Sequence, residues 1–86
     1  MAVYSIFFKD SVRKDLDSIA INDLQRIIER IGNLAEDPRP VGCEKLSGQE
    51  KYRVRQGNYR IIYSIQDTEL TVWVVKVGHR REVYRI

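Results

Sequence analysis

The stretch YRVRQGNYRIIYSI, residues 52–65, decides the fold because it contains two strands and the turn between them. Apolar and basic residues alternate over YRVR (52–55), the period of two that is typical of a half-buried strand. Gly57-Asn58 then turns the chain, and residues 59–65 form the returning strand. The sequence therefore predicts a β-hairpin with one apolar and one basic face.

A third strand is expected over residues 70–77, after a turn at Asp67-Thr68. If Ile65 pairs with Leu70, one face of the three strands is apolar and the other carries the arginines. The apolar face then contains Ile61, Tyr63, Val72 and Val74. The opposite face contains Arg53, Arg55 and Arg60.

The residues before the hairpin predict one strand and two helices. Residues 2–8 are β-branched and aromatic with little alternation, which indicates a largely buried strand. A short amphipathic helix is expected from Asp10 or Ser11 to about residue 20, and a second begins at Asn22 or Asp23. Asp37-Pro38 ends the second helix, because proline cannot continue a helix. The fold class is α+β: a strand, a two-helix hairpin and an antiparallel meander in a single sheet.

Length and composition are those of one globular domain covering residues 1–86. The apolar runs are too short to span a bilayer, and the first residues lack the basic region of a signal peptide. A single cysteine, Cys43, and a single histidine leave little for a zinc site. We therefore expect a cytoplasmic protein with no membrane segment, no metal and no cofactor.

Positive charge is concentrated in the second half of the chain. Residues 1–42 contain six Lys/Arg and seven Asp/Glu, whereas residues 43–86 contain nine Lys/Arg and five Asp/Glu. Arginine outnumbers lysine ten to five. Because the planar guanidinium suits bidentate contact with phosphate, this bias favours a polyanionic partner.

The three arginines of the basic face have two possible explanations. Each could pair with a carboxylate across the strands, but the acids in this region are few: Glu50, Asp67, Glu69 and Glu82. The better-supported interpretation is an anion site that stays unpaired until its ligand arrives. The tail adds Arg80, with His79 as a candidate for proton transfer and Tyr84 as a candidate for base stacking.

This basic cluster suits chemistry on RNA. No metal-ligand spacing, Gly-rich phosphate loop or paired-carboxylate site is visible in the sequence. RNA carries its own nucleophile, the 2′-hydroxyl, so an enzyme needs only to align it, stabilise charge and move protons. Fixed arginines can stabilise the developing charge by roughly 3 kcal/mol for each well-placed donor.

Four motifs resemble the RelE/ParE superfamily of type II toxins, and its RelE branch in particular. They are KLSG (45–48), YRVR (52–55), NYRIIY (58–63) and VGHRREVY (77–84). The resemblance covers essentially the whole chain. It implies the RelE-like fold and a metal-independent endoribonuclease that cuts mRNA in the ribosomal A site and inhibits translation. It also implies a cognate antitoxin as a partner, besides the ribosome and mRNA.

The resemblance also assigns site residues. The two basic residues of the family's first basic strand fall on Arg53 and Arg55, and three further positions fall on Arg60, Arg80 and Tyr84. Some relatives have lysines where this chain has Arg53 and Arg55. Because arginine does not lose its proton, proton transfer would then fall to His79 or to the ribosome. Ribosomal RNA would be contacted by Lys45, Lys51 and Arg81.

Two alternatives to the ribonuclease remain open at this point. A ParE-like inhibitor of DNA gyrase would share the fold and need no phosphodiester site. A catalytically impaired module that binds RNA or the ribosome would keep the basic face without cutting, and Arg53 is the residue that favours it.

Overall fold

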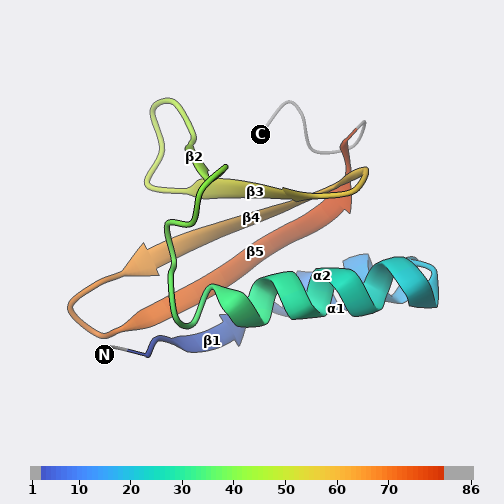
Figure 1. The fold of residues 1–86 in the computed structure, drawn as a ribbon, viewed down its shortest axis with the longest axis horizontal. Coiled ribbons are helices and arrows are strands. Elements are labelled where there is room, and N and C mark those ends of the chain that lie inside the picture. The colour runs from blue at the N-terminus through green and yellow to red at the C-terminus, as the bar shows by residue number, and fades with distance from the viewer. Residues whose placement is uncertain (1–2, 81–86) are drawn as a thin grey trace.

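The computed structural model describes residues 3–80, and these form five strands and two helices (Figure 1). The sheet has the order β1-β5-β4-β3-β2, with β1 parallel to β5 and the other pairs antiparallel. The strands are β1 (Ser5–Phe8), β2 (Glu44–Lys45), β3 (Tyr52–Gln56), β4 (Tyr59–Gln66) and β5 (Thr71–His79). The helices are α1 (Asp10–Asp17) and α2 (Ile21–Asn33). The α+β class and the single sheet are confirmed.

Both helices lie along the same side of the sheet, which leaves its other side without a helix (Figure 1). Val12 of α1 and Ile27 and Ile31 of α2 are buried against the strands. The N-cap residues of α1 and α2 are Lys9 and Ala20, which precede the expected caps, and neither makes a side-chain capping bond. At α1 a backbone bond replaces the side-chain cap: the N–H of Val12, in the first turn, donates to the carbonyl of Lys9 over 2.9 Å.

The core lies between the helices and one face of the strands. As predicted, Ile61, Tyr63, Val72 and Val74 share that face, and each is fully buried. The hydroxyl of Tyr63 donates to the carbonyl of Pro38 over 2.7 Å, so its polar tip is paired inside the core. Burial of side chains of this size stabilises the fold by roughly 1.5–3 kcal/mol each.

The predicted pairing of Ile65 with Leu70 is wrong by two residues. The connection is a four-residue turn over 67–70, not a two-residue turn, so Ile65 pairs with Val72. Leu70, which has a positive φ of 49°, belongs to that turn. The shift keeps the faces as predicted, because side chains alternate with a period of two.

The first strand is less buried than the sequence indicated. It is the edge strand of the sheet, and Phe7 and Phe8 remain 47% and 41% exposed. An edge strand is paired on one side only, so an unbroken apolar run does not guarantee burial.

Beyond the end of β1, helix α1 covers the open edge of β5. The carboxylate of Asp15 accepts the backbone N–H of Val77 over 3.1 Å and the ammonium of Lys76 over 3.0 Å. This contact closes a stretch of strand edge that would otherwise present unpaired N–H groups. None of the helices described for residues 3–80 is long and apolar enough to cross a membrane.

Candidate active site

Arg53, Arg55 and Arg60, which we call the arginine cluster, meet on the helix-free face of the sheet. Arg55 pairs directly with Arg60 across β3 and β4, and Arg53 lies two positions before Arg55 on the same strand. Directly opposed residues share a face, as do alternate residues of one strand. The residues between them, Val54 and Ile61, point into the core on the other face.

The hairpin turn fixes this convergence. Gly57 takes a φ of 59°, the positive value that the first central residue of a type II′ hairpin turn requires. The backbone carbonyl of Asn58 in the same turn accepts the N–H of Arg80 over 2.8 Å. Arg60 in turn donates from Nη1 to the carbonyl of Arg80 over 3.4 Å. The backbone of Arg80 is therefore held beside the cluster.

The cluster is electrostatically strained. Desolvation, followed by repulsion from Arg53, Arg55 and Arg80, lowers the pKa of Arg60 from its usual 12.5. The guanidinium nevertheless remains protonated at neutral pH. Repulsion of this kind favours a bound anion, since an anion offsets the mutual repulsion of the cations.

Glu44, which was not among the acids expected near the arginines, joins the cluster from β2. Its Oε1 accepts from Nη2 of Arg53 over 2.9 Å and lies 3.9 Å from Nη2 of Arg55. The hydrogen bond and charge of Arg53, reinforced by Arg55 and Arg60, lower the pKa of Glu44 below its usual 4.5. The expectation that little acid lies near the arginines is therefore wrong at this position.

Glu44 does not use all the donors that the cluster offers. Within residues 3–80, the Nε atoms of Arg53 and Arg60 are buried and have no hydrogen-bond acceptor. Buried donors without an acceptor are rare in folded proteins. The cluster therefore combines surplus positive charge, unused N–H groups and one ionised carboxylate.

His79 lies on the other side of the sheet. It pairs with Tyr59, whereas Arg60 pairs with Gly78, so His79 and Arg60 point to opposite faces. Its ring meets that of Tyr59 edge-on at 5.7 Å between centroids. It borders a hollow of about 350 Å³ that is also lined by Lys14 and Asp15 of α1. The structure does not bring His79 to the arginine cluster.

The remaining candidates have separate positions. Lys45 is exposed, pairs in register with Tyr52 rather than with an arginine, and lies 3.7 Å from Glu50. Lys51 directly precedes β3, and its carbonyl accepts the N–H of Leu46 over 2.8 Å. Tyr84 and Arg81 lie outside the described residues.

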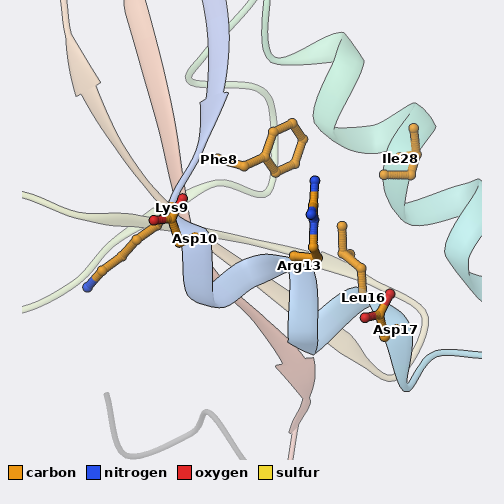
Figure 2. Close-up of a pocket in the computed structure, with 7 residues that line it drawn as sticks. All are labelled: Phe8, Lys9, Asp10, Arg13, Leu16, Asp17 and Ile28. Carbon is orange, nitrogen blue, oxygen red and sulfur yellow. The ribbon is translucent and has the colours of Figure 1, made fainter.

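A second hollow lies on the helical side of the molecule, between the end of β1, α1 and α2 (Figure 2). Its volume is about 610 Å³, and it combines apolar walls with charges of both signs. Phe8, Leu16 and Ile28 supply the apolar surface, while Arg13 and Asp17 supply charge. This mixture fits a protein segment better than a polyanion.

Three comparisons with known proteins agree with the geometry. Residues 6–84 match the family described as ParE toxin of type II toxin-antitoxin system, parDE. The chain belongs to this toxin family. It is 33% identical to toxin RelG of Mycobacterium tuberculosis, in an alignment that covers 95% of this chain and 97% of the relative.

More distant relatives of the toxin extend the comparison. The mRNA interferase toxin RelE of Escherichia coli is 27% identical, over 94% of this chain and 90% of the relative. The crystal structure of the toxin-antitoxin complex RelBE2 from M. tuberculosis superposes with a TM-score of 0.82 at 28% identity. That match covers 92% of this chain and 100% of the other. The chain is thus a type II toxin with the RelE fold.

Proposed function

We propose that this toxin is an endoribonuclease that cuts mRNA on the ribosome at the arginine cluster. The observation that carries the proposal is the convergence of Arg53, Arg55 and Arg60 on one face, with buried N–H donors that no described acceptor uses. The E. coli relative is named an mRNA interferase, which supports the same activity here.

In the proposed reaction, the 2′-oxygen attacks the adjacent phosphorus and the bond from phosphorus to the 5′-oxygen breaks. The products are a 2′,3′-cyclic phosphate and a 5′-hydroxyl end. The arginine cluster binds the phosphate and stabilises the charge on its oxygens as attack proceeds. Arg80, held beside Arg60, stabilises the departing 5′-oxygen, which takes its proton from water.

The proton of the 2′-hydroxyl needs an acceptor, and Glu44 is the group that the geometry supports. Arginine cannot serve because it does not deprotonate, and His79 lies on the other face. Glu44 is ionised and lies among the cations that would bind the phosphate. Glu44 therefore takes the role in proton transfer that the resemblance left to His79 or to the ribosome.

The cleavage proposal is tested by primer extension on a reporter mRNA in a translating extract. Arg60→Ala should reduce cleavage about 100-fold, the loss expected for one donor to the developing charge. Arg26→Ala removes the same charge from an exposed position on α2 and should leave cleavage unchanged. Equal cleavage by wild type and Arg60→Ala would overturn the proposal.

The acceptor is tested by the pH dependence of cleavage. With Glu44 as base, the rate should not fall between pH 7.5 and pH 5.5, because its pKa is lowered from 4.5. A histidine base would lose activity in that range, since histidine ordinarily titrates near 6.5. Glu44→Gln should reduce the rate by about 10²–10⁴-fold, and His79→Gln should not.

Inhibition of DNA gyrase is the second candidate, because the description of the matching family names the ParE toxin. It predicts that Arg60→Ala combined with Arg80→Ala keeps toxicity in cells, since gyrase inhibition needs no phosphodiester site. Growth arrest with no cut mRNA would favour it over the ribonuclease.

We further propose that a cognate antitoxin neutralises this toxin, as in the RelBE2 complex to which it is similar. The hollow between α1 and α2 offers an apolar seat for a partner segment, and an acidic tract would cover the arginine cluster. Co-expression with the adjacent small open reading frame should restore growth. Unchanged growth arrest would contradict this partner.

A further inference from the structure

Two aromatic rings stack on the helix-free face of the sheet, away from the core. Phe7 of β1 and Trp73 of β5 pair in register, with ring centroids 5.1 Å apart and an interplanar angle of 27°. Trp73 is 40% exposed although its neighbours Val72 and Val74 are fully buried. We call Phe7 and Trp73 the aromatic pair.

The aromatic pair lies on the same face as the arginine cluster. Trp73 pairs in register with Ser64 of β4, and Ser64 is four residues from Arg60 on the same strand. An even spacing along a strand keeps side chains on one face. At about 3.3 Å per residue, Arg60 and Ser64 are ~13 Å apart, a length that a few nucleotides span.

Core packing does not explain this placement. The hydrophobic core is built from the opposite face of β4 and β5, and neither Phe7 nor Trp73 belongs to it. Exposed aromatic rings beside a basic surface are the combination that binds single-stranded nucleic acid. Bases stack on the rings while the cations contact the backbone.

We propose that the aromatic pair stacks with an unpaired base of the mRNA strand whose scissile phosphate lies on the arginine cluster. This inference rests on the proposed function and extends it, because it gives the substrate a direction across the sheet, from β3 toward β1. The shared face and the spacing identify the occupant as the substrate strand rather than a separate ligand. Stacking would hold the strand in register for cleavage.

The test uses the fluorescence of Trp73, which is the one tryptophan of the chain. The full-length toxin is titrated with a 2′-O-methyl oligoadenylate of about ten nucleotides, which binds but cannot be cut. Saturable quenching is expected. Phe7→Ala should weaken binding about 5- to 150-fold, the range for loss of one stacked base.

Matched variants separate stacking from other roles. Phe8→Ala removes the same side chain, at similar exposure, from the next position on the opposite face, and should leave RNA affinity unchanged. Phe7→Tyr should restore binding, whereas Phe7→Leu, apolar but not aromatic, should not. Circular dichroism of each variant confirms that it is folded.

Each outcome decides the inference. Equal affinity of Phe7→Ala and wild type, with binding lost in Arg55→Ala, would overturn the stacking site and leave the ribonuclease proposal intact. Full rescue by Phe7→Leu would show that an aromatic ring is not required for RNA binding, and would overturn the stacking site. Absence of quenching together with absence of mRNA cleavage would overturn both proposals.

Discussion

The two faces of the sheet are built from the same strands and have opposite properties. On the helix-covered face, Val54 and Ile61 are fully buried and contribute to a continuous core. On the helix-free face, their strand neighbours Arg53, Arg55 and Arg60 gather positive charge. The main core cluster thus lies on one face, while the other face holds charges that oppose folding. Substitutions on the two faces should therefore separate stability from activity.

The largest effect on stability is expected for Ile61→Ala. Ile61 is fully buried, so its truncation leaves a cavity and should lower the free energy of unfolding by about 2–5 kcal/mol. Urea denaturation measures the loss. Cleavage per folded molecule should stay near the wild-type value, and a specific loss of activity would show that the two faces are not independent.

A smaller loss is expected for Tyr63→Phe. The substitution keeps the ring but removes the hydroxyl that donates to the buried carbonyl of Pro38 over 2.7 Å. Leaving that carbonyl unpaired should cost about 1–3 kcal/mol. The midpoint of thermal unfolding is the measurement, and an unchanged midpoint would mean that water or another donor replaces the hydroxyl.

A pH-dependent effect is expected at the turn between β4 and β5. Arg39 forms two hydrogen bonds to Asp67, at 2.9 and 3.1 Å, and Tyr4 donates a third. These hydrogen bonds lower the pKa of Asp67 from 3.8 to about 2, and the bonds from Arg39 have the largest effect. Because the folded pKa is the lower one, the stabilisation is present above pH 3.8 and is lost as pH falls toward 2.

Asp67→Asn tests this linkage. The difference in thermal midpoint between wild type and variant should be constant above pH 5 and shrink as the pH approaches 2. Asp23→Asn, a change of the same type in the first turn of α2, gives the comparison for a carboxylate outside the pair. A difference that does not depend on pH would contradict the role of the Arg39–Asp67 pair.

The smallest effect on stability is expected for Arg55→Ala. Its side chain is 59% exposed, and its nearest carboxylate oxygen is 3.9 Å away on Glu44. The free energy of unfolding should change by no more than about 0.5 kcal/mol, because an exposed contact is lost while repulsion is relieved. Cleavage should fall strongly in the same sample. A large loss of stability would show that the cluster has a structural role.

Much of the fold was predictable because it depends on local patterns. The alternation over residues 52–65 and the Gly57-Asn58 turn were sufficient to place the hairpin and its two faces. The register of β4 against β5 could not be predicted from such patterns. It depends on the length of the turn over 67–70, in which Leu70 takes a positive φ. The exposure of β1 depends on its place at the sheet edge, which only the tertiary arrangement determines.

The candidate site was predictable only where it depends on local sequence patterns. Arg53, Arg55 and Arg60 follow from alternation within one hairpin, and the structure brings them together. Glu44 was missed because a two-residue strand has no detectable period, and its approach to Arg53 depends on the register of β2 against β3. The position of His79 depends on the register of β4 against β5, including a shift between Ile62 and Tyr63.

The contact between Asp15 and β5 has a consequence for how the protein is made. Asp15 and Lys76 are 61 positions apart, so α1 emerges from the translating ribosome long before the strand edge that it covers. At ~5–20 residues per second, that delay is roughly 3–12 s. Until β5 is synthesised, β1 has no strand to pair with and Arg60 lacks the neighbouring strand that supports it. The nascent chain therefore cannot assemble its basic face until the ribosome has synthesised β5.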